Sequence, residues 1–133
     1  DGVLVAPMVT DGVETILGAF NDPTFGPVVV FGLGGVLVEV LGDVTYRLAP
    51  FGPRTAMEMI REIRGFAALD GARGRPPVDL DALAQALSAL SRFADANRDV
   101  LDSVEVNPFL ARPRGLGGVA ADALITVRSG RRR

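Results

Sequence analysis

The spacing of apolar residues changes twice along this chain of 133 residues. The first third carries short β-branched runs that Gly and Pro separate, the middle carries apolar residues at helical spacing, and the last third returns to short alternating runs. Short runs with brief connections favour antiparallel strands, whereas a 3.6-residue period favours helices. The sequence therefore predicts a single α+β domain over residues 1–133, with an antiparallel sheet and two principal helices.

The strand-like runs are separated by turn-forming residues such as Asn21-Asp22-Pro23. In the first third we expect strands at Val3–Val9, which should be buried, and at Glu14–Phe20, Val28–Phe31, Val36–Leu41 and Val44–Leu48. In the last third we expect strands at Asp102–Val106 and Val119–Val127, with Asn107-Pro108 interrupting the first of them and a Pro- and Gly-rich turn at Arg112–Gly118 between the two.

The middle of the chain predicts the two helices. The first covers Arg54–Arg64, with Gly65 as its C-terminal stop. The second begins after Asp79, a good N-cap residue. Its apolar stripe should pack in the core and consists of Leu80, Leu83, Leu87, Leu90 and Phe93 or Ala94, while Gln85, Ser88 and Arg92 should face away.

Cys, His and Lys are all missing from the chain, and their absence limits its chemistry. There is no Cys and no His, which excludes disulfides, thiolate metal sites and an imidazole base or phosphoryl acceptor within these residues. All 14 basic residues are Arg, so a phosphate clamp must use guanidinium groups or backbone N–H groups.

Charge and hydropathy indicate which partners and which cellular compartment to expect for the chain. With a formal net charge of −2, it is not expected to bind nucleic acid. The longest apolar stretch, Val28–Val38, is too short to cross a bilayer and contains glycines. No basic segment typical of a secretory signal opens the chain. We therefore expect a cytoplasmic protein without membrane contact.

A glycine-rich segment, Gly32-Leu33-Gly34-Gly35, has two open interpretations. It is either a phosphate-binding loop or a sharp bend between two strands. Leu37 stands where a dinucleotide fingerprint needs its last glycine, and a strand-like run follows instead of a helix. Without Lys the segment is not a Walker A loop either.

The strongest candidate site is the pair Asn107 and Asp122. If the last two strands form a hairpin, these residues are equidistant from a turn centred between Arg114 and Gly115. A carboxylate and an amide oxygen would then face each other, as a hard Mg²⁺ ion prefers. The alternative is that both side chains only satisfy backbone groups of the turn.

A second candidate is Arg47, the single cation in the first fifty residues. It stands among apolar strand residues, as Glu14 and Glu39 do. Arg47 is either a phosphate ligand or, like the two glutamates, part of the solvent face of a half-buried sheet.

Taken together, a series of motifs resembles one family. The motifs are Gly2–Val9, Gly12–Gly18, Asp22–Pro27, Phe31–Gly35, Val38–Leu41, Asp43–Pro50, Arg64-Gly65 and Glu105–Pro108. They resemble the C-terminal part of the ATP-grasp domain in acyl-CoA synthetases of the nucleoside-diphosphate-forming type, which are related to the β subunit of succinyl-CoA synthetase. The same domain ends some bacterial protein lysine acetyltransferases.

The resemblance implies a mechanism and a set of ligands. Such enzymes use ATP and Mg²⁺, pass a phosphoryl group through a histidine, form an acyl phosphate and transfer the acyl group to CoA. It implies that Mg²⁺ is bound by Asn107 and Asp122, and that CoA is bound mainly outside this piece. It also implies adenine contacts from the backbone of Val5, Ala6, Pro7 and Met8.

The chain also departs from the family pattern. Ala6 replaces the usual Gln, and Leu124 stands where the family has a basic residue. The phosphate-binding Lys of the other subdomain and the relay His are missing. The resemblance thus implies the second half of an ATP-grasp domain, inactive alone, whose partners are the missing half and the CoA-binding domains of the same protein.

Two other classes of function compete with this ligase fragment. One is a degenerate regulatory module of a protein lysine acetyltransferase, which keeps at most nucleotide binding. The other is a pure assembly module. In the isolated chain, a sheet without its other half is expected to self-associate.

Overall fold

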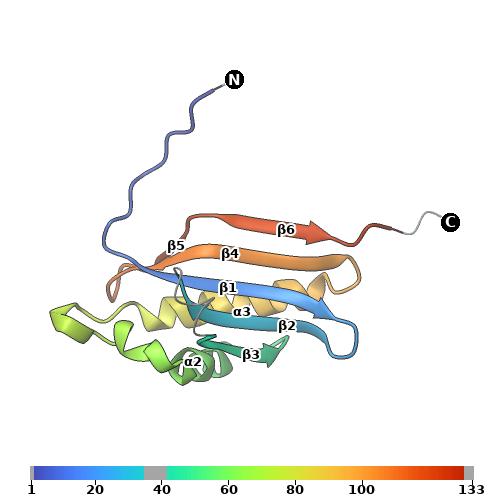
Figure 1. Cartoon of the computed structure of the whole chain (residues 1–133), viewed down its shortest axis with the longest axis horizontal. Helices are drawn as coiled ribbons and strands as arrows, with labels where there is room; N and C mark the ends of the chain where they lie inside the picture. Colours follow the sequence, from blue (N-terminus) through green and yellow to red (C-terminus); the bar gives the residue numbers. More distant parts are fainter. Residues whose placement is uncertain (1, 35–41, 131–133) are drawn as a thin grey trace.

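The computed structural model describes residues 2–34 and 42–130 as one antiparallel sheet covered by helices on one face (Figure 1). The strand order is β3-β2-β1-β4-β5, and β6 also pairs with β4. The strands are β1 Val13–Asp22, β2 Gly26–Leu33, β3 Val44–Leu48, β4 Leu101–Ala111, β5 Gly118–Ala120 and β6 Ala123–Val127; the helices are α2 Pro53–Glu62 and α3 Leu80–Ala96. The predicted α+β class is confirmed.

The core lies between the sheet and the two helices. Alternate residues of β1 and β2 are buried there, including Leu17, Val29 and Phe31. They meet fully buried residues of the helices, such as Met59 and Leu87. Each side chain of this size contributes about 1.5–3 kcal/mol when it leaves water. The other face of the sheet carries no helix among the described residues, and we call it the open face (Figure 1).

The N-cap of α3 is confirmed, and Asp79 does more than cap the helix. Its Oδ1 accepts the Ala82 N–H at 3.1 Å, and its Oδ2 accepts the N–H groups of Gly115 at 3.2 Å and Gly117 at 2.9 Å. These hydrogen bonds hold the pKa of Asp79 below its ordinary value of 3.8, and the bond from Ala82 contributes most. One carboxylate therefore links the start of α3 to the turn between β4 and β5.

The polar face predicted for α3 is wrong at Ser88. Ser88 is fully buried, as is Ser91, and both hydroxyls donate to the carbonyl oxygen of Phe51, at 2.8 and 3.1 Å. A short hydroxyl side chain fits a closely packed interface when a backbone acceptor is available. Gln85 and Arg92 are exposed as expected.

The end of the first helix also differs from the prediction. Helix α2 stops at Glu62, Ile63 is extended, and Gly65 has a φ of −81°, so it is no left-handed cap. The carboxylate of Asp43 accepts the N–H groups of Arg64 at 2.7 Å and Gly65 at 2.8 Å. This tertiary contact starts a short 3-10 turn, η1, at Arg64–Ala68.

The predicted buried strand Val3–Val9 is wrong in this chain. Residues 2–10 contain no strand, and Val3, Leu4 and Val5 are 88–92% exposed. The segment extends away from the sheet (Figure 1). An apolar run becomes a strand only when a neighbouring edge pairs with it, and the described chain offers none here. The predicted strand Val36–Leu41 lies outside the described residues.

The last strands differ from the prediction in two details. Strand β4 passes through Asn107-Pro108, because the register between β1 and β4 shifts at this position and the ladder does not require an N–H from Pro108. The returning segment Val119–Val127 is divided into β5 and β6, with Ala121 and Asp122 between them. Within the described residues, no helix is both long and apolar enough to span a membrane.

Candidate functional site

The predicted register of Asn107 and Asp122 is confirmed. On one side of the pair, Val106 lies opposite Ala123, and on the other side Phe109 lies opposite Ala120. The Asn107 N–H donates to the Asp122 carbonyl oxygen at 3.0 Å, which closes the ladder between the two strand pairs. Cross-strand partners share a face of a sheet. Asn107 and Asp122 therefore lie opposite each other where β5 and β6 meet.

The pair belongs to the open face of the sheet. Asn107 Nδ2 donates to Glu105 Oε1 at 3.3 Å, so these two side chains of β4 lie on the same side. In the neighbouring strands, Glu105 pairs with Gly18, and Gly18 pairs with Val30. The adjacent register positions hold Ala19 and Val29, which are buried under the helices. Since strand faces alternate, Glu105 and Asn107 point away from the helices.

The hydrogen bond to Glu105 fixes which way the Asn107 amide group is turned. A carboxylate accepts hydrogen bonds, so the amide turns its nitrogen toward Glu105 and leaves its oxygen for another partner. The sequence placed Glu105 in one motif with Asn107 but gave it no role at the site. Its position two residues before Asn107 on the same strand was the available signal.

The donor set of this site is made of hard oxygen atoms. Asp122 supplies a carboxylate and Asn107 an amide oxygen, and both residues are exposed. Oxygen ligands of this kind suit Mg²⁺ or Ca²⁺. No group of three or more His, Cys, Asp or Glu arranged to hold a metal occurs in the described part of the chain. A cation at Asn107 and Asp122 therefore needs further ligands, such as water or phosphate oxygens.

Gly18 shapes the open face beside Glu105. It lies in the middle of β1 between Val30 and Glu105. A Cβ added to Gly18 would stand 3.1 Å from Val30 Cγ1 and 3.4 Å from the Val104 carbonyl oxygen. A side chain at this buried position would therefore crowd Val30, so glycine allows the close packing of β1 between β2 and β4.

Arg47 does not lie near Asn107 and Asp122, and its expected role as a phosphate ligand stays a prediction. Arg47 pairs across the sheet with the buried residue Val29, which places it on the face that carries the helices. Its guanidinium forms an ion pair with Glu62 of α2 and donates to the Tyr46 carbonyl oxygen. In this arrangement the Arg47 guanidinium points away from the face that carries Asn107.

Val5, Ala6, Pro7 and Met8, the expected adenine contacts, are exposed in the extended N-terminal segment. Val5 is 88% and Met8 is 86% exposed. The structure does not bring them to Asn107 and Asp122. Their backbone groups make none of the hydrogen bonds that join separate segments of the described chain. They are therefore free to pair with a ligand or another strand.

The glycine-rich segment is partly described, and its first part has a packing role. Gly32 and Leu33 belong to β2, and the Gly34 N–H donates to the Glu14 carbonyl oxygen at 2.7 Å. A Cβ at Gly34 would lie 2.8 Å from the Glu14 Cβ, so only glycine fits. Gly35 and the residues up to 41 lie outside the described residues.

Comparison with known proteins gives a consistent result. Residues 1–127 match the ATP-grasp domain family. The chain is 41% identical over 127 residues to the beta subunit of acetate–CoA ligase (ADP-forming) II from Pyrococcus furiosus, covering 96% of this chain and 54% of that subunit. It is 39% identical over 116 residues to 4-hydroxybutyrate–CoA ligase (ADP-forming) from Nitrosopumilus maritimus, covering 87% of this chain and 16% of that protein.

The fold comparison agrees. Acetyl-coenzyme A synthetase 1 of Ca. Korarchaeum cryptofilum, solved in complex with coenzyme A and Mg-AMPPCP, superposes with a TM-score of 0.82 and 41% identity. The match covers 92% of this chain and 55% of that one. The chain thus spans about half the length of the Pyrococcus subunit and of the solved chain, and 16% of the Nitrosopumilus ligase. On both sequence and fold, this chain belongs to the ATP-grasp domain family.

Proposed function

We propose that this chain is the nucleotide- and Mg²⁺-binding half-site of an ADP-forming acyl-CoA ligase. The observation that carries the proposal is the pairing of Asn107 with Asp122 on the open face of the sheet. It is supported by relatives named as ADP-forming CoA ligases over 96% and 87% of this chain. It is also supported by a solved relative that holds coenzyme A and Mg-AMPPCP.

The donor atoms fit the metal. Asp122 supplies one anionic oxygen and Asn107 one neutral oxygen, and Mg²⁺ keeps its other positions for water and phosphate oxygens. When bound, the ion neutralises phosphate charge that would otherwise repel an attacking group. Asn107 and Asp122 would hold it, and Glu105 would orient the Asn107 amide. The exposed backbone of Val5–Met8 would meet the adenine edge.

The complete enzyme would join a carboxylic acid to CoA and convert ATP to ADP, with a phosphohistidine and an acyl phosphate on the way. This chain has no His and no Lys, so the histidine and a phosphate-binding Lys must come from the rest of the protein. The partners of the chain are therefore the other ATP-grasp half and the domains that bind CoA. The acetyltransferase alternative gains no support, because the relatives reported above are named ligases.

A direct assay tests the proposal. The complete protein is incubated with ATP, Mg²⁺, CoA and a panel of small carboxylic acids, and ADP and acyl-CoA are both measured. We expect stoichiometric ADP and acyl-CoA with at least one acid, and no product when EDTA removes the metal. Acyl-CoA formation with AMP in place of ADP, or none with any acid while nucleotide still binds, would rule out this activity.

A further inference from the structure

The loop between η1 and α3 holds an arginine in an unusual conformation. Gly71, Arg73 and Gly74 all have positive φ, of 92°, 60° and 74°. Arg73 is the one residue other than glycine in this region of φ within the described chain. Side chains rarely adopt this conformation because Cβ crowds the backbone. An outlier of this kind points to a role for the side chain that is displayed.

Contacts on both sides keep the loop in place. The Val78 N–H donates to the Leu69 carbonyl oxygen at 2.9 Å, and the Arg114 N–H donates to the Pro77 carbonyl oxygen at 3.0 Å. A Cβ on Gly71 would meet the Arg75 carbonyl oxygen at 2.9 Å, so the loop closes tightly on itself. Two consecutive prolines, at 76 and 77, restrict φ. The backbone therefore presents Arg73 and Arg75 in a preset arrangement.

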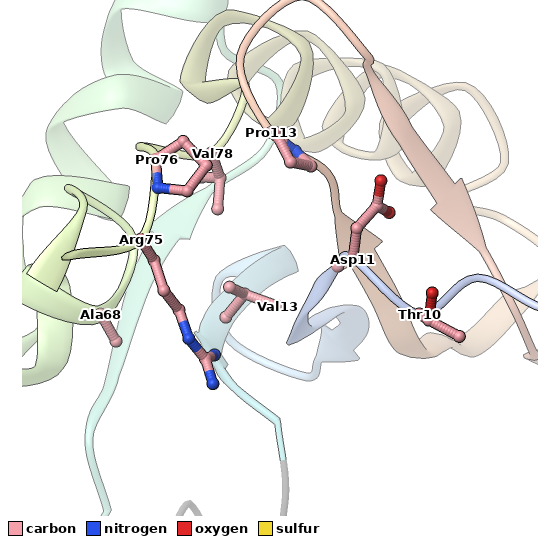
Figure 2. Close-up of a pocket in the computed structure, with 9 residues that line it drawn as sticks. Thr10, Asp11, Val13, Ala68, Arg75, Pro76, Val78 and Pro113 are labelled. Atoms are coloured by element: carbon pink, nitrogen blue, oxygen red, sulfur yellow. The ribbon is translucent and has the colours of Figure 1, made fainter. Parts of the chain in front are cut away.

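Arg75 lies between two adjoining pockets. One has a volume of about 360 Å³ and is lined by Thr10, Val13, Ala68 and Pro113 among others. The other, of about 390 Å³, is lined by Leu33, Gly65, Ala68 and Arg73 among others. Figure 2 shows the Arg75 side chain extending into the first pocket toward Val13. Arg75 thus lines both pockets, and Arg73 also lines the second.

The charge in these pockets is not balanced. The first pocket contains one carboxylate, Asp11, and Arg112 already binds both its oxygens, at 3.0 and 3.1 Å. Figure 2 shows the Asp11 carboxylate turned away from Arg75. Within residues 2–34 and 42–130, neither Arg73 nor Arg75 takes part in an ion pair or a side-chain hydrogen bond. Two cations therefore face a cavity with no free anion from the described residues.

We propose that the Gly71–Pro77 loop is a second anion site, in which Arg73 and Arg75 bind a phosphate group. The planar guanidinium matches the oxygen geometry of phosphate and forms paired hydrogen bonds with it. The Thr10 hydroxyl adds a neutral donor on the opposite wall of the first pocket. The small side chain of Ala68 leaves the space between the two pockets open.

This anion site is separate from Asn107 and Asp122. The first pocket lies where Val13 pairs with Ala111, four residues along β4 from Asn107. At about 3.3 Å per strand residue, the separation is roughly 13 Å. One phosphate group therefore cannot contact both sites. The loop site should bind phosphate in the absence of a metal ion.

The test uses inorganic pyrophosphate as the probe, in EDTA, with the 133-residue chain and titration calorimetry. We expect saturable binding that Arg75→Gln weakens by about tenfold, since a charged hydrogen bond is lost. Arg92→Gln is the matched control. It removes the same charge from an exposed position of α3, remote from the loop, and should leave binding unchanged. Asp122→Asn should also leave it unchanged, which separates this site from the proposed metal site.

Arg73→Asn distinguishes a displayed ligand from a structural residue. Asn tolerates positive φ better than Arg, so the melting temperature should stay the same or rise while pyrophosphate affinity falls. The affinity for ADP is then measured in EDTA with the wild type and Arg75→Gln. If the substitution weakens ADP and pyrophosphate binding equally, the site binds a nucleotide. If it weakens only pyrophosphate binding, the site binds another phosphate compound. Equal affinity of the wild type, Arg75→Gln and Arg73→Asn, or no saturable binding, overturns the site.

Discussion

At the level of single residues, the site at Asn107 and Asp122 has few protein ligands. A Mg²⁺ ion that keeps several waters depends strongly on its one carboxylate. We predict that Asp122→Asn in the complete enzyme lowers Mg²⁺-dependent ADP formation by at least about 100-fold. The melting temperature should not change, because Asp122 is exposed and its backbone makes the ladder contact.

Asp99→Asn is the control for this change. Asp99 is exposed and lies between α3 and β4, beside the opposite end of β6 from Asp122, so the same loss of charge there should leave turnover intact. If Asp122→Asn and Asp99→Asn show equal turnover, Asp122 is not a metal ligand.

The hydrogen bond from Asn107 to Glu105 makes a second prediction at this scale. Without the Glu105 carboxylate, the Asn107 amide loses the acceptor that orients it. We expect Glu105→Ala to raise the Mg²⁺ concentration for half-maximal activity by about tenfold, as for other residues that orient a metal ligand. Glu105→Gln keeps an oxygen acceptor and should preserve most of the affinity. A larger defect in Glu105→Gln than in Glu105→Ala would contradict this role.

At the level of secondary-structure elements, Asp79 connects the start of α3 to the β4–β5 turn. We predict that Asp79→Ala lowers the free energy of unfolding by about 1–2 kcal/mol at neutral pH, the usual cost of losing an N-cap. Chemical denaturation of both proteins measures the difference. Asp79→Asn retains an acceptor oxygen and should cost less.

The same residue predicts a dependence on pH. The pKa of Asp79 is below 3.8 in the folded chain, chiefly because the Ala82 N–H binds the carboxylate. A carboxyl group with a lowered pKa stabilises the fold above its unfolded pKa and loses this effect as the pH falls through the folded pKa. The stability difference between the wild type and Asp79→Ala should therefore be full at pH 5 and shrink below about pH 3.8. A difference that does not change between these values would exclude the mechanism.

At the level of the whole molecule, one edge and one face of the sheet are uncovered. Strand β6 pairs only with β4 in the described chain, and Leu124, Ile125 and Val127 on it are 53–66% exposed. An apolar edge strand invites pairing with another chain. We predict that the isolated 133-residue chain self-associates as its concentration rises, as seen by sedimentation velocity.

A charge on the edge should reduce this association. Val127→Lys places a cation on the free edge of β6, whereas Val100→Lys places one on an equally apolar exposed residue before β4. We expect the first variant to be more monomeric than the wild type and the second to behave like the wild type. Equal association of all three would show that another surface is responsible.

Local patterns in the sequence determined much of this molecule. Short β-branched runs between Gly and Pro residues predicted β1, β2 and β3, and the residue type at position 79 predicted the cap of α3. The register of Asn107 with Asp122 was assumed from a hairpin centred between Arg114 and Gly115, and the structure has this register. Each of these features depends on residues that are close together in the chain. Backbone geometry and the spacing of side chains are then sufficient to predict it.

Only the tertiary structure decided the remaining features, because they depend on contacts between distant residues. Ser88 is buried because Phe51 offers it a carbonyl oxygen, and α2 ends where Asp43 binds the next turn. Arg47 pairs with Glu62 on the helix side of the sheet, away from Asn107. Val3–Val9 has the composition of a strand, but strand formation needs a partner edge that the described residues do not supply. The spacing of apolar residues assigns a residue to one face of its strand or helix. The packing of the other elements decides whether that face is covered.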